Sequence, residues 1–176
     1  MKKIILLLTV IFSGFVAESE TSADLLQKGY SRLYEKDLKG AIHEFDRVIE
    51  QDKLNNPSSI QILNAYKYKG ICLYELKNYE EAVSALSYTM EKGGNEYVDS
   101  YNYLGMCFVE LKKFPEAIQI LDKAIQIQTD NIAAFYWRGF AKVQSGDQSG
   151  CSDLGTSKTL GNKDAQKLID TYCKKF

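Results

Sequence analysis

Four cysteines and one histidine are the side chains with the strongest intrinsic chemistry in this sequence of 176 residues. A histidine can activate a nucleophile, and thiolates can bind zinc or form disulfides. Zinc sites use cysteines only a few residues apart, whereas Cys72, Cys107, Cys151 and Cys173 are widely separated. The spacings of the P-loop and of the dinucleotide-binding loop are missing from the sequence. We therefore expect no metal, no cofactor and no enzymatic activity, and look to the surrounding elements for the role of the cysteines.

The chain repeats one pattern of small and large apolar residues. Gly70, Gly105 and Gly139 follow one another at intervals of 35 and 34 residues, and Gly29 heads a similar segment upstream. An alanine and then a large apolar residue recur at fixed distances after the first three glycines (Ala41 and Phe45, Ala82 and Leu86, Ala117 and Leu121). The second half of each unit is apolar at helical spacing, which predicts pairs of amphipathic helices.

This pattern resembles the tetratricopeptide repeat over about residues 22–160. Aromatic residues match that family in the turn of two units and near the start of the first helix in three (Tyr79, Phe114; Tyr66, Tyr101, Phe135). In the first unit Leu38 replaces the turn aromatic, the usual closing proline is missing, and "KLNNPSS" is inserted before the second unit.

The resemblance implies an all-α fold, a right-handed α-solenoid of about four helical hairpins with a C-terminal capping helix. One hairpin cannot bury its apolar faces alone, so the hairpins must stack. We predict repeats at about 22–55, 63–96, 98–131 and 132–164, and the capping helix at about 163–175, with Asn162 as its N-cap.

The N-terminus has the layout of a secretory signal peptide. Two lysines precede an apolar run over residues 4–12, and small residues follow up to Ser19. We expect a signal peptide at 1–19, cleavage near Ser19, a mature domain at 20–176, and a periplasmic or secreted bacterial protein. The alternative is an uncleaved anchor; the sequence has no second segment long enough to span a membrane.

Cys151 stands out where the fourth unit should repeat the pattern. Aligning Leu154 with Phe45 places Gly150 in the alanine slot, and Cys151 then matches the apolar Ile42. The resemblance implies that this side of the helix faces the last helix, whose apolar face is flanked by Cys173 (Ala165, Leu168, Ile169, Tyr172). We predict a Cys151–Cys173 disulfide that staples the capping helix; the alternative is two ordinary buried cysteines.

Cys72 and Cys107 occupy a different slot, held by Ser31 and Ala141 in the other units. A slot that accepts only small residues predicts two core thiols. His43 has polar counterparts, Ser84 among them, which predicts a solvated surface residue.

In tetratricopeptide proteins the first helices line a concave groove that holds a peptide or a partner helix. The matching residues form an apolar and aromatic set with few charges (Tyr30, Tyr34, Lys67, Ile71, Tyr74, Asn102, Met106, Val109, Tyr136, Phe140, Val143). The carboxylate clamp of chaperone-binding members does not match, because its positions hold Leu26/Tyr30, Lys67/Ile71 and Asn102/Met106. In the other interpretation of the set, some of these aromatics pack between repeats or against the last helix.

We therefore expect an exported, non-catalytic protein–protein interaction module that binds a peptide or helix in this groove. A net charge of −1 gives no general attraction to nucleic acid or anionic lipid. The alternative is a self-associating structural or assembly protein of the cell envelope, and an envelope hydrolase dependent on His43 is the third interpretation.

Overall fold

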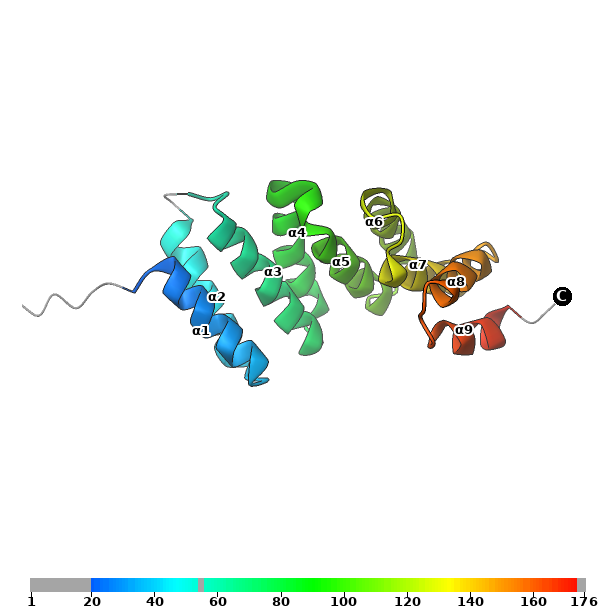
Figure 1. Ribbon diagram of the computed structural model, residues 1–176, viewed down its shortest axis with the longest axis horizontal. Coiled ribbons are helices and arrows are strands. Elements are labelled where there is room, and N and C mark those ends of the chain that lie inside the picture. The colour runs from blue at the N-terminus through cyan, green and yellow to red at the C-terminus, as the bar shows by residue number, and fades with distance from the viewer. Residues whose placement is uncertain (1–19, 54–55, 174–176) are drawn as a thin grey trace, which may run out of the picture.

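The computed structural model describes residues 20–53 and 56–173, and the predicted signal peptide at 1–19 lies outside them. Within the described residues the chain is helical, with no strand. Its helices form a row in which each packs against the next (Figure 1). They are α1 (Ser22–Tyr34), α2 (Leu38–Asp52), α3 (Ile60–Glu75), α4 (Tyr79–Gly93), the 3₁₀ helix η1 (Gly94–Tyr97), α5 (Val98–Glu110), α6 (Phe114–Ile127), α7 (Ile132–Gln144), α8 (Gly150–Thr159) and α9 (Ala165–Tyr172).

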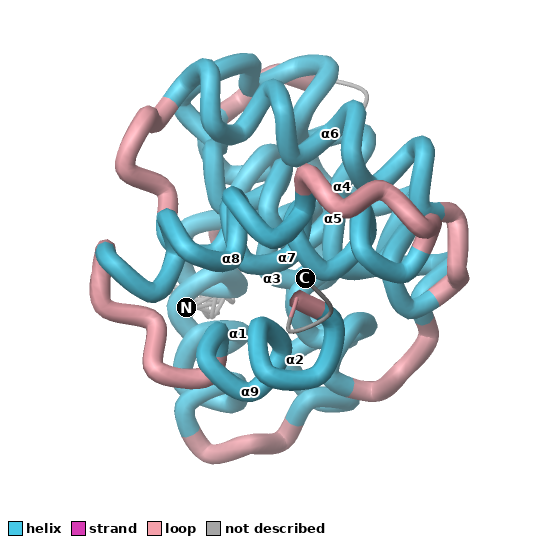
Figure 2. Tube along the Cα trace, turned by 90° about the vertical axis from the view of Figure 1, so that its right-hand side faces the viewer, coloured by secondary structure: helices cyan, strands magenta, loops and turns pink. Residues whose placement is uncertain are grey.

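The helices pair into four hairpins, α1–α2, α3–α4, α5–α6 and α7–α8, and α9 follows the last. The hairpins stack into a right-handed α-solenoid, seen along its long axis in Figure 2. The second repeat begins with α3 at Ile60, slightly before the predicted position 63. No helix in the described part of the chain is long and apolar enough to cross a bilayer.

The recurring glycines mark the points where the two helices of a hairpin approach most closely. A Cβ on Gly29, Gly70 or Gly105 would lie 2.4–2.6 Å from a side-chain atom of the large apolar residue of its own hairpin. Those partners are Phe45, Leu86 and Leu121, all fully buried. Only glycine permits this contact, so the glycine and the large residue together set the helix separation.

The fourth hairpin has a closer contact, between two glycines. A Cβ on Gly139 would lie 2.9 Å from the Gly150 carbonyl oxygen, and a Cβ on Gly150 would lie 2.4 Å from the Gly139 carbonyl oxygen. Leu154 is fully buried beside them. Gly150 therefore does stand in the alanine slot, as the apolar spacing predicts.

The turn within each hairpin needs one residue in the left-handed region. Lys36, Lys77 and Lys112 have φ values of 64°, 63° and 59° at equivalent turns, and Gly146 has 88° in the fourth. This conformation stops the first helix and reverses the chain within a few residues.

One local prediction needs correction. The residue preceding α9 is Asp164, and the predicted N-cap Asn162 instead accepts a hydrogen bond from the Asp164 amide at 3.0 Å. The turn just before Ala165 has the 3₁₀ hydrogen-bond pattern, because the Gln166 amide donates to the Lys163 carbonyl three residues back. The α-helix therefore begins only at Ala165. Between α4 and α5, the helix η1 brings Tyr97 into the core.

Both ends of the stack are closed. At the N-terminal end, ion pairs connect Arg32 of α1 to Glu44 of α2, and Arg47 of α2 to Glu20, which precedes α1. At the C-terminal end, α9 packs on α8, and a disulfide joins Cys151 to Cys173 with their Cα atoms 5.8 Å apart. Polar or capped ends are what a solenoid needs to remain soluble.

Candidate protein-binding face

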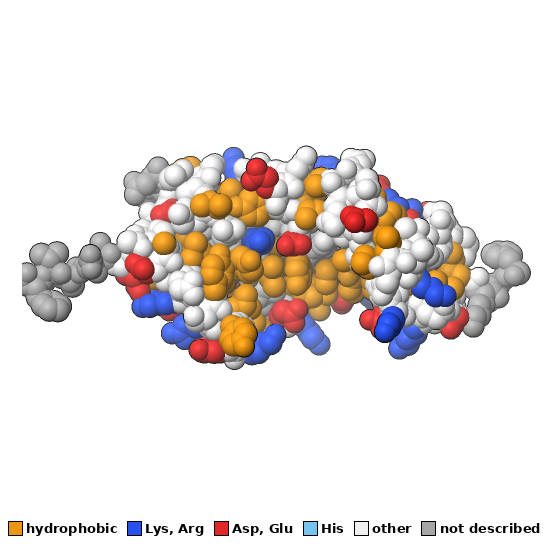
Figure 3. Space-filling view, viewed as in Figure 1, with side chains coloured by type: hydrophobic (Ala, Val, Ile, Leu, Met, Phe, Trp, Pro, Cys, Tyr) orange, Lys and Arg blue, Asp and Glu red, His pale blue; other side chains and the backbone are white. Residues whose placement is uncertain are grey.

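The first helices of the four hairpins, α1, α3, α5 and α7, present one continuous side of the solenoid, which we call the first-helix face. Hydrophobic side chains gather in a band across the middle of the molecule, over α3 and α5, with few charged groups among them (Figure 3). Large contiguous apolar surfaces of this kind mark interaction sites in soluble proteins.

The predicted groove residues lie on these four helices, and most remain accessible. Tyr34 is 89% exposed at the end of α1. Eight others are half-buried (Tyr30, Lys67, Ile71, Tyr74, Asn102, Met106, Tyr136, Phe140). Val109 and Val143, which belong to the wider set, are buried in the core instead.

Several aromatic rings of this face also pack between neighbouring repeats. Tyr30 of α1 meets Tyr68 of α3 edge-on, with ring centroids 4.9 Å apart. Tyr74 of α3 meets Tyr103 of α5 in the same way at 5.6 Å. Each pair therefore holds two repeats together while its rings stay half-buried, so the two interpretations of these aromatics are compatible.

Sequence reasoning missed three aromatic residues of the face, Tyr68, Tyr103 and Trp137. Each directly follows a predicted groove residue, and they recur at the 35- and 34-residue intervals of the glycines. They are half-buried against the core. Applying the repeat interval to every aromatic residue would have found them.

The two polar residues predicted for the middle of the face are engaged within the chain. The Lys67 ammonium lies 4.5 Å from the ring centroid of Tyr68 and 5.7 Å from that of Tyr97, within cation–π range. The Asn102 side-chain oxygen accepts a hydrogen bond from Asn131 at 3.0 Å. The face therefore offers mainly apolar and aromatic contacts.

Four phenols on this face are neutral at physiological pH, because burial disfavours their charged form. Burial raises the pKa of Tyr30 to about 12, and it also raises the pKa of Tyr74, Tyr103 and Tyr136. Neutral hydroxyls can both donate and accept hydrogen bonds, so they suit a polar backbone or side chain of a guest.

Hollows open at the two ends of the face. One of about 280 Å³ lies along α1 and is lined by Gln27, Tyr30, Ser31, Tyr34 and Glu35. Another, of about 260 Å³, lies between α5 and α7 and is lined by Val109, Glu110, Lys112, Phe114, Phe140 and Gln144. Each is large enough for a few side chains and too small for a whole drug-sized ligand.

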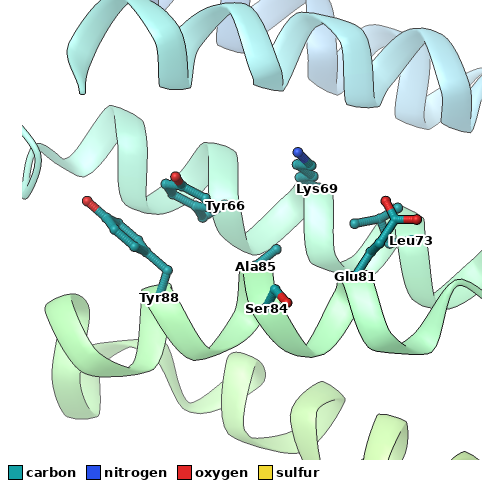
Figure 4. Close-up of a pocket in the computed structure, with 7 residues that line it drawn as sticks. All are labelled: Tyr66, Lys69, Leu73, Glu81, Ser84, Ala85 and Tyr88. Atoms are coloured by element: carbon teal, nitrogen blue, oxygen red, sulfur yellow. The ribbon is translucent and has the colours of Figure 1, made fainter. Parts of the chain in front are cut away.

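A larger pocket, of about 350 Å³, lies between α3 and α4 (Figure 4). Its main polar groups already have partners within the chain. The Tyr88 hydroxyl donates to the Pro57 carbonyl at 2.6 Å, and Lys69 pairs with Asp46 at 2.5 Å. Tyr66 and Tyr88 stack on each other with centroids 4.0 Å apart. We therefore take the first-helix face as the candidate site.

The chemically reactive side chains lie away from this surface or are inaccessible. His43 is exposed on α2. Cys72 and Cys107 are fully buried, and burial raises their pKa values to about 11 and about 12, so both are protonated thiols. Among residues 20–53 and 56–173, no three metal-ligating side chains come together.

Comparison with known proteins agrees with this fold. Residues 99–128, which span α5 and α6, match the family model of the tetratricopeptide repeat. A search of curated proteins finds no match to the chain.

Several solved structures superpose over most of the chain, a tetratricopeptide-repeat protein among them. MamA from Desulfovibrio magneticus RS-1 is 21% identical, with a TM-score of 0.71 over 81% of this chain and 77% of that one. YrrB, described as a TPR protein with an unusual peptide-binding site, is 19% identical, with a TM-score of 0.70 over 85% and 74%. PilF of Pseudomonas aeruginosa is 17% identical, with a TM-score of 0.72 over 86% and 66%. At these identities the likeness shows the fold alone.

Proposed function

We propose that this chain is an interaction module that binds a peptide or helix of a partner protein on its first-helix face, without catalysing a reaction. The observation that carries the proposal is the series of half-exposed aromatic side chains along α1, α3 and α7 (Tyr30, Tyr74, Tyr136, Phe140). The peptide-binding site named for YrrB, which shares the fold, supports it.

Physical reasons favour an apolar segment as the guest. Aromatic side chains bury a large area at a low cost in conformational entropy, which is why they dominate binding energy at interfaces. The rings here are already held by contacts between repeats, so binding does not need to immobilise them. An amphipathic helix or an extended segment with apolar side chains fits a long apolar face of this kind.

Self-association by continuing the stack end to end has less support. The N-terminal end carries the ion pairs of Glu20, Arg32 and Arg47, and the C-terminal end is covered by α9. A second copy would have to break these contacts before it could add a hairpin. A partner on the side of the stack would leave them intact.

Export to an oxidising compartment, the bacterial periplasm, is part of the proposal. The Cys151–Cys173 disulfide supports it, because such bonds persist mainly outside the reducing cytosol. Fractionation of host cells tests it. The full chain should reach the periplasm with this disulfide formed, and a chain lacking residues 2–19 should stay inside; an unchanged location would contradict it.

Site-specific photocrosslinking tests the binding face. A photoreactive phenylalanine analogue replaces Ile71 or Met106 on the face, and Ser84 or Gln119 on the second helices as matched controls. We expect crosslinked partners in the native host from the first two positions and none from the controls. Equal products from all four positions would contradict the proposal.

A paired substitution then measures the contribution of the rings. Tyr74→Ala with Tyr103→Ala removes one aromatic pair of the face, and Tyr88→Ala removes a ring of similar burial outside it. Recovery of the crosslinked partner should fall about tenfold or more in the first variant and stay unchanged in the second, with equal helix content by circular dichroism. Equal recovery from both would refute the assignment of the face.

A further inference from the structure

The last helix, α9, lies across one end of the first-helix face. It packs mainly on α8 and makes a smaller contact with α7. It has only eight residues, and Ala165 is its one buried residue. Leu168, Ile169 and Tyr172 are half-buried. Its non-covalent contacts are therefore few compared with those of the other described α-helices.

Tyr172 makes the contact with the face. Its ring lies against the ring of Phe140, with centroids 6.4 Å apart, and its hydroxyl accepts a hydrogen bond from the Gln144 side chain at 2.7 Å. Phe140 directly follows the repeat glycine of α7, as Tyr30, Ile71 and Met106 do in the other repeats. An aromatic side chain of the chain itself thus lies where the side chain of a guest would bind in the fourth repeat.

The free part of the same site lies beside this contact. Phe140 and Gln144, which hold Tyr172, also line the hollow between α5 and α7. A guest that follows the face from α1 towards α7 would reach this hollow and then meet Tyr172. The bound segment therefore ends at the third repeat as long as α9 stays in place.

The disulfide holds the end of α9 that carries Tyr172. Cys173 is the residue next to Tyr172, and Cys151 lies in the first turn of α8. Both are half-buried, in contrast to the fully buried Cys72 and Cys107. An external reductant can therefore reach this bond, whereas the other two thiols are shielded.

We propose that α9 is a disulfide-held lid, which covers the Phe140 end of the first-helix face when Cys151 and Cys173 are oxidised and uncovers it when they are reduced. The reductant is a dithiol of the thioredoxin class. Its thiolate attacks one sulfur of the bridge, and its second thiol resolves the mixed disulfide. The dithiol becomes a disulfide. Its two electrons and two protons pass to Cys151 and Cys173, which become free thiols. The role of the lid in binding rests on the proposed function, whereas the opening of α9 on reduction does not.

Hydrogen exchange of the purified full chain tests the lid without a partner. Amide exchange in residues 165–172 is followed by mass spectrometry before and after treatment with dithiothreitol. We expect exchange in α9 to become about tenfold faster or more, while α1–α6 keep their rates. Unchanged protection of α9, or equal loosening of the whole chain, would overturn the proposal.

Two further measurements separate a lid from a structural staple. Trp137, the single tryptophan, packs on Phe140 with centroids 6.2 Å apart, so its quenching by acrylamide should increase when Tyr172 leaves. The Cys151→Ser, Cys173→Ser double variant should match the reduced protein in both readouts without reductant. Quenching in this variant equal to that of the oxidised protein would overturn the proposal. Photocrosslinking from Ile71 is unaffected by such a result, so a failed lid and a failed binding face remain distinguishable.

Discussion

Replacing individual glycines by alanine tests how the hairpins are packed, because alanine has opposite effects in a helix interior and at a close contact. Alanine favours a helix over glycine by about 1 kcal/mol. The same methyl group costs about 1–3 kcal/mol where it overpacks a filled core. Three glycines of this chain differ in what that methyl group would meet, so the sign and size of each change follow from the surroundings.

Gly155 is in the interior of α8, and nothing lies within 4 Å of a Cβ placed there. We expect Gly155→Ala to stabilise the chain by about 1 kcal/mol, which raises Tm by roughly 2–4 °C for a domain of this size. At Gly105 the methyl group would lie 2.5 Å from Leu121 Cγ. That side chain is fully buried but can shift slightly, so Gly105→Ala should destabilise by about 1 kcal/mol net.

At Gly139 the methyl group would meet backbone atoms as well as the Leu154 side chain. It would lie 2.9 Å from the Gly150 carbonyl oxygen and 3.0 Å from the Leu154 amide nitrogen. The backbone of α8 cannot move aside without separating from α7, so Gly139→Ala should destabilise by about 2–3 kcal/mol, or roughly 5–10 °C in Tm.

Thermal and urea unfolding followed by circular dichroism at 222 nm gives the order directly. The expected order of stability is Gly155→Ala, wild type, Gly105→Ala and then Gly139→Ala. All four proteins should have the disulfide intact, so that the covalent constraint is the same. A Gly139→Ala variant as stable as Gly105→Ala would refute the contact between α7 and α8.

Three further outcomes follow from individual contacts. Asp153→Asn should lower the free energy of unfolding by about 2–3 kcal/mol, because this buried carboxylate accepts two hydrogen bonds from the Arg138 guanidinium of α7. Asp122 also pairs with Arg138, but its side chain is 45% exposed. Asp122→Asn should therefore cost less than about 1 kcal/mol, measured by urea unfolding. The Lys77→Gly variant should be about 1 kcal/mol more stable than the Lys77→Ala variant, because Lys77 has a φ of 63°, which glycine adopts without strain. This order is the reverse of that in a helix interior, and equal Tm values of the two variants would contradict it. Burial raises the thiol pKa values of Cys72 and Cys107 from 9.0 to about 11 and about 12, so the unfolded chain loses these protons first and stability should fall as pH rises above about 9. The Cys72→Ala, Cys107→Ala double variant should lose less Tm than wild type between pH 9 and 11.

Regular spacing made most of the fold predictable from the sequence. A glycine, an alanine and a large apolar residue recur at fixed intervals, and each triplet specifies one close helix contact. Aligning the fourth unit on Leu154 placed Gly150 and Cys151 correctly, because the buried apolar residue fixes the register. Where the repeat pattern is present, the spacing of residues in the sequence and the packing of helices in the structure indicate the same contacts.

The differences occur where that pattern stops. The helix η1 lies between two repeats, where Tyr97 joins the core through the fold rather than through a periodic position. The start of α9 depends on a tight turn at Lys163, which competes with the cap expected at Asn162. The engagement of Lys67 and Asn102 also follows from neighbours on other helices, Tyr97 and Asn131, which no local pattern indicates.

The weakness of the fourth hairpin connects the disulfide with the binding face. Helix α8 has two glycines in ten residues and no side-chain cap at its N-terminus. It is held by the glycine contact with α7, by the ion pairs of Asp153 and by the Cys151–Cys173 bond. The bond closes a loop of 22 residues, worth about 3 kcal/mol in the chain-entropy model. Local opening begins where contacts are fewest, and among the α-helices that the structure describes this is α9, beside Phe140. In the proposed lid, this bond therefore also controls the accessibility of the Phe140 end of the first-helix face.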